Sequence, residues 1–310
     1  MPQKTKKDFI AISDFSKKEL LSFLELAKKL KKAHRKGKDK PLLRGKSLGM
    51  IFQKSSTRTR VSFESGMIQL GGHALFLSSN DIQIGRGETI ADTARVLSRY
   101  VDGIMARTYK HQDVLDLAKY ATVPVINGLT DFNHPCQALT DVFTVLEKKT
   151  SFRKLKFVYI GDGNNMVHSL LSACSKLGIN IVVCTPPNYK PSNEVVEEAK
   201  KYAQKNNSSI SLVEEPWGAI KDADVVYTDT WASMGQEAEH EKRLVAFRNY
   251  QIDKDLVKHA KKDHIVMHCL PAHRGEEITS DVLDGPNSVI FDQAENRMHV
   301  QKAILVKLMS

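Results

Sequence analysis

The sequence predicts an α/β fold of two doubly wound parallel-sheet domains, with helices on both faces of each sheet. Three observations carry this prediction. Apolar runs of strand length alternate with helical patterns from one end of the chain to the other. The runs are continuously apolar, which is typical of parallel strands buried on both faces. The 310 residues exceed what one hydrophobic core usually supports, so two domains are expected.

The first series of elements begins with a helix and ends near residue 147. Ser16 and Glu19 have the spacing of a capping box, and one apolar stripe follows them. Two glycines at 71–72 end the second helix, and Pro135 suits the first turn of the last one. In chain order, the elements are a helix near 20–30, a strand at 47–52, a helix at 57–70, a strand at 73–77, a helix near 90–97, a strand at 103–106, a helix at 114–121, an extended segment at 122–126 and a helix from about 135 to 146.

The second series runs from 148 to 294 and repeats the alternation. A glycine at 178 ends its first helix. In chain order, the elements are a strand at 156–163, a helix at 166–178, a strand at 179–186, a helix at 193–205 and strands at 223–230, 264–271 and 288–293. A last helical pattern occupies 294–309. We therefore place the domain boundary near 147–148.

Composition and cysteine spacing exclude some classes of protein. Hydrophobic residues make up 41% and charged residues 26% of the chain, which is typical of a soluble globular protein. No apolar run is long enough to span a bilayer, and the N-terminal segment lacks the apolar region and cleavage site of a secretory signal. The four cysteines are scattered without CxxC spacing, so we expect reduced thiols in a cytoplasmic protein.

The net charge of +10 raises the question of an anionic partner. Much of the excess lies in one basic run at 28–40. No aromatic residues are interleaved in it and no nucleic-acid-binding motif follows, which favours a solvated helix end. We expect no nucleic-acid partner and no membrane partner. A noncatalytic protein that binds RNA or DNA in a salt-sensitive way remains the alternative from a different class.

Polar stretches follow most of the predicted strands, where ligands bind in open α/β folds. One of them, SSTRTR at 55–60, leads into the helix that starts at Thr57. Free backbone N–H groups at a helix start favour an anion, hydroxyl groups add donors, and Arg58 can fork onto two phosphate oxygens. Helix capping alone would also explain the hydroxyl groups. Arg60 points elsewhere on the helix, which predicts an internal salt bridge.

Other phosphate and metal motifs fail on spacing. GKS at 45–47 lacks the upstream glycine of a P-loop, and GDGNNM at 161–166 lacks the third glycine of a dinucleotide fingerprint. HCLPAHRG at 268–275 holds two histidines and a cysteine. Because His268 and Cys269 should face opposite sides of a strand, and no carboxylate has zinc spacing, we predict no metal site. Cys269 taken alone could also be a buried apolar residue.

Four motifs together resemble the transcarbamylase family, in its ornithine-type branch, and the match covers nearly the whole chain in order. STRTR at 56–60 and HPCQALTD at 134–141 are similar to the family's carbamoyl phosphate signatures. DTWASMGQE at 229–237 and HCLPAHRGEE at 268–277 are similar to its ornithine-type acceptor signatures. Aspartate-type members share the first pair but lack the SMG loop and the HCLP cysteine. All four in order are highly specific.

The resemblance implies a carbamoyl phosphate-binding domain at 1–147, with a C-terminal helix at 295–310 packing back on it, and an ornithine-binding domain at 148–294. It implies carbamoyl phosphate contacts from Ser56, Thr57, Arg58, Thr59, Gln83, Arg107, His134, Pro135, Cys136, Gln137, Cys269, Leu270 and Arg297. It implies ornithine contacts from Asn165, Asp229, Ser233 and Met234. The catalytic residues it implies are Arg107, His134, Gln137, Asp229 and Cys269.

The resemblance further implies the reaction and the assembly. The carbamoyl group of carbamoyl phosphate would pass to the δ-amine of L-ornithine, giving citrulline and phosphate. No cofactor is expected, because the donor is already activated. Family members form trimers, and Gln83 lies in a loop that reaches into a neighbouring subunit's site. A transcarbamylase for another amine, such as putrescine, is the closest alternative.

Taken singly, each candidate also has an ordinary structural interpretation. Surface ion pairs, helix caps, turns and solvated helix positions would account for Arg107, His134, Asn165, Asp229, Gln83 and Arg297. Because all of these residues fall in the family's motifs, in order and with the expected spacing, we favour the functional interpretation for the set. Gln53 and Ser55 stand where many family members have Glu and Pro, and both precede the expected phosphate-binding residues.

Overall fold

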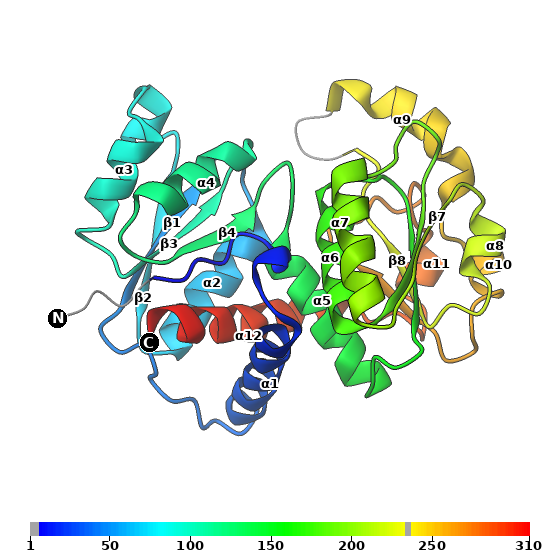
Figure 1. Cartoon of the computed structure of the whole chain (residues 1–310), viewed down its shortest axis with the longest axis horizontal. Helices are drawn as coiled ribbons and strands as arrows, with labels where there is room; N and C mark the ends of the chain where they lie inside the picture. Colours follow the sequence, from blue (N-terminus) through cyan, green and yellow to red (C-terminus); the bar gives the residue numbers. More distant parts are fainter. Residues whose placement is uncertain (1–5, 233–236) are drawn as a thin grey trace. The chain divides into compact units, whose positions relative to one another are not determined.

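The computed structural model describes residues 6–232 and 237–310, which form two compact units (Figure 1). Unit 1 holds the chain up to Leu139 together with Arg297–Ser310, and unit 2 holds Thr140–Asn296. Two helices, α5 (Pro135–Lys149) and α12 (Ile290–Met309), continue across the division. Neither has a glycine or proline after its first residue, so nothing in its sequence ends it there.

The sheet of unit 1 is parallel, with the strand order β2-β1-β3-β4. Its strands are β1 (Ser47–Phe52), β2 (His73–Ser78), β3 (Gly103–Arg107) and β4 (Val125–Leu129). The chain passes from β1 to β2 on one side and then returns to place β3 on the other side. Phe52 and Arg107 are paired at the ends of these two strands. The order thus reverses between β1 and β3, where an α/β sheet opens a crevice for ligands.

The sheet of unit 2 is also parallel, with the strand order β7-β6-β5-β8-β9. Its strands are β5 (Lys156–Ile160), β6 (Asn180–Cys184), β7 (Ile210–Val213), β8 (Val225–Thr228) and β9 (Ile265–His268). The order reverses between β5 and β8. The segments that follow these two strands therefore emerge together at one edge of the sheet. The two parallel sheets with their helices confirm the predicted α/β class.

Capping residues explain where several helices begin and end. The helices within unit 1 are α1 (Lys17–His34), α2 (Thr57–Gln69), α3 (Ile90–Leu97) and α4 (His111–Tyr120). Those within unit 2 are α6 (Asn165–Leu177), α7 (Asn193–Lys205), α8 (Pro216–Ile220), α9 (His240–Phe247), α10 (Lys254–Val257) and α11 (Ser280–Leu283). The predicted capping box of Ser16 and Glu19 is confirmed. Gly178 ends α6 with a φ of 83°, a left-handed conformation that glycine adopts without steric cost. Figure 1 shows α6 and α7 side by side.

The predicted strand at 288–293 is wrong. Helix α12 begins at Ile290, and Ser288 forms only an isolated parallel bridge with Val266. A short apolar run such as VIF fits a buried helix as well as a strand, because periodicity needs a longer window. Strand β7 was not predicted, since it is a half-exposed edge strand without a continuous apolar run. The short helices α8 to α11 were missed for a similar reason, namely their length.

The second half of α12 belongs to unit 1, where buried polar contacts hold it. The ammonium group of Lys302 is buried, and it donates to Asp39 at 2.9 Å and to Gln69 at 2.8 Å. Gly66 of α2 faces the same lysine, and an added Cβ there would lie 3.3 Å from its Cγ. Close packing of α12 on α2 therefore depends on a small residue at position 66.

The basic run at 28–40 forms the end of α1 and the turn after it. Most of its side chains are exposed, although Lys31 is buried. This agrees with the predicted solvated helix end. Among the residues that the structure describes, no helix is both long and apolar enough to cross a membrane.

Candidate active site

The first cluster of candidates lies in unit 1, where β1 leads into α2. Ser56 is the N-cap of α2, and its hydroxyl oxygen accepts from the backbone N–H of Thr59 at 3.2 Å. Thr57 is exposed, and Arg58 is partly exposed on the first turn of the helix. The helix start thus offers backbone N–H groups, a hydroxyl group and a guanidinium to an anion. The predicted salt bridge of Arg60 is confirmed, because its Nε lies 3.0 Å from Glu64.

Arg297 of α12 joins this cluster. Its guanidinium donates to the hydroxyl oxygen of Thr59 at 2.8 Å, and both side chains are buried. Arg107 is buried at the end of β3, and His134 is buried just before α5. Burial lowers the pKa of His134 well below its usual value, and the positive charges of Arg297 and Arg107 lower it further. The imidazole is therefore neutral, and it lies within electrostatic range of two guanidinium groups.

The first turn of α5 supplies the remaining candidates of unit 1. Pro135 is its first residue, and Gln137 is fully buried. The thiol of Cys136 is buried and donates to the backbone carbonyl of Asn127 at 3.3 Å. Burial raises the pKa of Cys136 to about 12, so this thiol is neutral. Cys136 can take part in anion binding through its backbone, but its thiol is committed to packing.

The neutral, buried state of His134 has a consequence for stability. Because its pKa in the folded protein is lowered from 6.5, the unfolded chain binds a proton below pH 6.5 that the folded chain does not. Stability present above pH 6.5 is thus lost as the pH falls, at a slope of up to about 1.4 kcal/mol per pH unit. We expect His134→Gln to flatten the slope in urea unfolding between pH 7 and 5. The exposed His73 provides the control, His73→Gln, which should keep the slope; an unchanged slope in His134→Gln would contradict the assignment.

Two glutamines of unit 1, Gln83 and Gln53, differ from the other candidates in their contacts. Gln83 starts the short 3₁₀ helix η2 (Gln83–Arg86), where its side chain is exposed. No hydrogen bond among the described residues ties it to the other candidates. Gln53 joins the segments after β1 and β3, since it donates to Asp113 at 2.9 Å and accepts from the N–H of Tyr109 at 3.0 Å. This departure from the family pattern therefore has a structural role.

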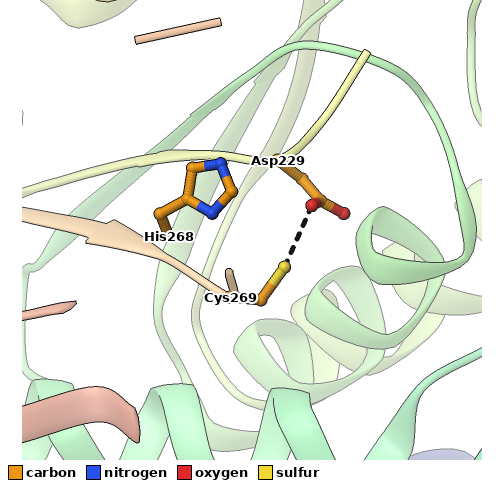
Figure 2. A group of neighbouring side chains, drawn as sticks. All are labelled: Asp229, His268 and Cys269. Atoms are coloured by element: carbon orange, nitrogen blue, oxygen red, sulfur yellow. Dashed lines mark hydrogen bonds between the residues drawn. The ribbon is translucent and has the colours of Figure 1, made fainter. Parts of the chain in front are cut away.

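The second cluster lies in unit 2 and centres on Asp229, directly after β8. Its Oδ1 accepts from the thiol of Cys269 at 3.0 Å (Figure 2). The same oxygen accepts from the N–H of Thr230 at 2.8 Å. Its Oδ2 accepts from the amide of Asn164 at 3.1 Å. A carboxylate offers about four acceptor positions, and the residues that the structure describes fill three of them. Asp229 is only 7% exposed, so a cation placed there would bind an aligned carboxylate with little competing water.

Asn164 is a residue that sequence reasoning missed. It is the N-cap of α6, accepting from the N–H groups of Met166 and Val167, whereas Asn165 is the first residue of the helix. Its Nδ2 reaches across the point where the strand order reverses and donates to Asp229. The doubled asparagine was visible in the sequence, but only the helix start decides which one caps it.

Cys269 and Leu270 follow the end of β9 in a tight turn. Leu270 has a positive φ of 59°, which is rare for a side chain of this size. Its N–H donates to Nδ1 of His268 at 2.8 Å, which leaves Nε2 of that ring to donate to Glu277 at 2.9 Å. The expectation that His268 and Cys269 face opposite sides is wrong. Ligand atoms of Asp229, His268 and Cys269 lie within 4.8 Å of one another, because Cys269 is already beyond the strand.

The candidates Ser233 and Met234 lie outside the described residues. The segments on either side of them are tied together by Arg243 of α9. Its guanidinium donates to the carbonyl of Trp231 at 2.8 Å and to Asp162 at 2.9 Å. Burial raises the pKa of Asp162 to about 6, although the charge of Arg243 acts against that rise. Arg243 thereby fixes both flanks of the segment that follows Asp229, and sequence reasoning did not single it out.

The two clusters offer different chemistry. The cluster of unit 1 combines helix N-termini, the guanidinium groups of three arginines and a neutral imidazole, which suits a phosphate with a neighbouring carbonyl oxygen. The cluster of unit 2 combines a carboxylate, a thiol and an amide, which suits an amine or an ammonium group. The four cysteines all lie in the described part of the chain and form no disulfide.

Comparisons with known proteins match two long parts of the chain to one family. Residues 7–147 match the family model described as the carbamoyl-P binding domain of aspartate/ornithine carbamoyltransferase. Residues 153–308 match the model of its Asp/Orn binding domain.

Solved and curated relatives are similar over nearly the full chain. The anabolic ornithine carbamoyltransferase of Pyrococcus furiosus is 60% identical over 98% of this chain and 96% of its own. The solved structure of the ornithine carbamoyltransferase from Pyrococcus furiosus matches with a TM-score of 0.96 at 58% identity, covering 100% of this chain and 99% of that one. The anabolic ornithine carbamoyltransferase of Campylobacter jejuni matches with a TM-score of 0.92 at 44% identity, covering 97% and 98%.

Proposed function

The chain belongs to the aspartate/ornithine carbamoyltransferase family, and on that premise we propose that it transfers the carbamoyl group of carbamoyl phosphate to the δ-amine of L-ornithine, giving L-citrulline and phosphate. The observation that carries the choice of acceptor is the bonding of Cys269 and Asn164 to Asp229, since the donor signature is common to the whole family. We assign carbamoyl phosphate binding to residues 1–147 with 295–310, and ornithine binding to 148–294.

The donor would be held by the cluster of unit 1. Ser56, Thr57, Arg58 and Thr59 at the start of α2 bind the phosphate in this proposal, and Arg297 adds a positive charge beside Thr59. Negative charge grows on the leaving phosphate and on the carbonyl oxygen as the amine attacks. Arg107 stabilises the carbonyl oxygen, and Gln137 orients the carbamoyl group. The lowered pKa of His134 supports a role as a neutral hydrogen-bonding group, not as a cation.

The acceptor would be held by the cluster of unit 2, where Asn165, Ser233 and Met234 complete the proposed contacts. The alkyl amine of ornithine has an unperturbed pKa of about 10.4 and must lose a proton before it attacks. In this proposal the carboxylate of Asp229 accepts a hydrogen bond from the amine, and the amine takes the place of the Cys269 thiol, which donates to Asp229 in the structure. Because carbamoyl phosphate is already an activated donor, positioning the two substrates and removing the proton from the amine are the main catalytic contributions in this proposal.

A direct assay tests this proposal. The purified full-length chain, carbamoyl phosphate and a panel of amines are incubated, and citrulline and phosphate are measured. We expect phosphate release that depends on ornithine, with one citrulline formed per phosphate. Release that depends on aspartate instead, or on no amine, would refute the proposed acceptor.

We propose that the active form is a homotrimer in which Gln83 completes the site of a neighbouring subunit. Gln83 is exposed, and no hydrogen bond among the described residues joins its side chain to the other candidates, which supports this. The prediction is that an inactive Arg58→Gly variant and an inactive Gln83→Ala variant recover activity when mixed, because some hybrid trimers contain a fully native site. The recovery is measured after subunit exchange has been verified by native mass spectrometry. Two inactive parents that exchange subunits without any recovery would contradict a shared site.

The cellular setting is part of the proposal. The free thiols support a reducing compartment, and we place the enzyme in the cytoplasm. The relative from Pyrococcus furiosus is named anabolic, which favours the citrulline-forming direction of arginine biosynthesis for this chain.

A further inference from the structure

A second group of titratable side chains lies in unit 2, on the turn that follows the Cys269 segment. His273, Glu276 and Glu277 place one ligand atom each within 4.8 Å of one another. The Nδ1 atom of His273 lies 3.7 Å from an oxygen of Glu276 and 3.8 Å from Oε2 of Glu277. Ligands about 2.0–2.1 Å from a tetrahedral metal ion are about 3.4 Å apart, so the two distances from His273 would need to shorten by only a few tenths of an ångström.

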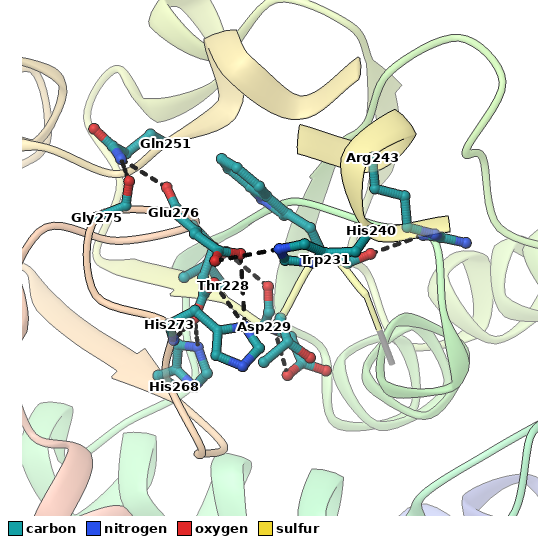
Figure 3. Close-up of polar contacts among 12 residues, drawn as sticks. Thr228, Asp229, Trp231, His240, Arg243, Gln251, His268, His273, Gly275 and Glu276 are labelled. Atoms are coloured by element: carbon teal, nitrogen blue, oxygen red, sulfur yellow. Dashed lines mark hydrogen bonds and ion pairs between the residues drawn. The ribbon is translucent and has the colours of Figure 1, made fainter. Parts of the chain in front are cut away.

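The turn is held rigidly by its backbone. The N–H of Glu276 donates to the carbonyl of His273 at 3.0 Å, and Gly275 has a left-handed φ of 89° that folds the chain back. The side-chain amide of Gln251 donates to the carbonyls of Gly275 at 2.6 Å and of Glu276 at 2.7 Å (Figure 3). These bonds bring His273 and the two carboxylates together without any ion. Metal binding would therefore cost little additional conformational entropy.

Glu277 supplies an independent sign that a cation belongs here. Its side chain is fully buried, and its Oε1 accepts from His268 at 2.9 Å and from the N–H of His273 at 2.6 Å. Its Oε2 accepts no hydrogen bond from any described residue. A buried carboxylate oxygen without a donor is costly, and this one is directed toward the ring of His273. A metal ion at that point would satisfy it.

We propose that His273, Glu276 and Glu277 form a binding site for a divalent first-row metal ion, with Zn²⁺ as the best-suited member. One imidazole nitrogen and two carboxylate oxygens match the donor types that Zn²⁺ accepts. His273 and Glu276 are 43% and 29% exposed, which leaves water to fill the remaining position. His240, at the start of α9, lies 3.6 Å from the other oxygen of Glu276 (Figure 3).

The ion would act on the segment between Cys269 and Glu277. Glu277 already holds His268 at the end of β9, and Glu276 contacts the first residue of α9. An ion shared by His273 and both carboxylates therefore fixes the turn that follows Cys269 against α9. Metal binding should stabilise unit 2 by an amount that grows with the logarithm of the metal concentration above Kd.

The test is metal binding to the full-length chain, which needs no turnover and so does not depend on the proposed reaction. Because Asp229, His268 and Cys269 form another group of possible ligands, the measurements are made in wild type and in Cys269→Ser. We expect about one Zn²⁺ per chain in both by equilibrium dialysis. Co²⁺ bound to Cys269→Ser should show ligand-field absorption without a thiolate charge-transfer band. At a Zn²⁺ concentration about one hundredfold above Kd, Tm should rise on the order of 5 °C.

Substitutions locate the site. Glu276→Gln and His273→Gln remove one donor each from partly exposed positions and should weaken Zn²⁺ binding about tenfold or more. Glu241→Gln, an equal charge change at an exposed position of α9, should leave Kd unchanged. The proposal is overturned by an absence of saturable binding, by binding that is lost in Cys269→Ser, or by binding that Glu276→Gln and His273→Gln do not alter.

Discussion

Replacing Arg58 by glycine is expected to lower kcat/KM for carbamoyl phosphate by about 10²–10³-fold while the protein stays folded. The reason is that Arg58 lies on the first turn of α2, where it can fork onto two phosphate oxygens beside the free N–H groups of the helix. The side chain of Arg58 is partly exposed and does not belong to the hydrophobic core. The substitution should therefore weaken phosphate binding and slow departure of the phosphate, without unfolding the protein. Steady-state kinetics with ornithine at saturation measure the effect.

Two further variants separate the charge from the helix. Glycine in a helix costs about 1 kcal/mol relative to alanine, so Arg58→Gln is compared as a variant that keeps helix propensity. Arg60→Gly introduces the same glycine two residues later, where the arginine pairs with Glu64, and should lose little activity. A folded Arg58→Gly protein with ordinary carbamoyl phosphate affinity and rate would mean that the anion is bound elsewhere.

The second large effect concerns the acceptor, for which we expect the parent enzyme to prefer ornithine over putrescine by about 10⁴-fold in kcat/KM. Putrescine lacks the α-amino and α-carboxylate groups, so polar groups built to pair with them would be left unpaired in a buried site. This discrimination is larger than apolar fit alone provides, because a missing methylene changes binding by only about 10–200-fold. Parallel citrulline and carbamoylputrescine assays give the ratio.

Asp229→Asn probes the same site from the protein side. The substitution removes the charge while it keeps the size of the side chain, and hydrogen bonds to charged groups are worth about 1.5–3 kcal/mol. We therefore expect kcat/KM for ornithine to fall about 10–100-fold, with unchanged carbamoyl phosphate affinity. Asp255→Asn, at an exposed position of α10 in the same unit, is the control and should be neutral. Equal use of putrescine and ornithine by the parent, or an equal loss of donor affinity in Asp229→Asn, would show that the acceptor is misassigned; the donor site in unit 1 would be unaffected.

The sequence predicted the elements whose signals are local. The capping box at Ser16, the helix start at Thr57 and the end of α6 at Gly178 follow from hydrogen bonds and backbone conformations within a few residues. The strands β1, β3, β5 and β8 were predicted because burial on both faces makes each a continuous apolar run. The rule that ligands bind beyond strand ends then selected the segments that hold most of the candidates.

The elements that the sequence missed depend on tertiary neighbours. Residues 288–293 include the apolar run VIF and were predicted as a strand, yet α12 begins at Ile290. Gln293, in the first turn of this helix, accepts from the N–H of His268, a contact between residues 25 positions apart. β7 is a strand because β6 offers it an edge to pair with, and four residues carry no pattern that could show it.

The sequence by itself determined the family, the α/β class and the candidate residues, because motifs and apolar runs are properties of short segments. Only the tertiary structure decided how these residues are paired. Asn164, not Asn165, bonds Asp229, because the start of α6 meets the end of β8 where the strand order reverses. Arg297 reaches Thr59 across 238 positions of sequence, and Glu277 turns back to His268 through a glycine turn. Such pairings require the strand order and the helix packing, which no local pattern of residues encodes.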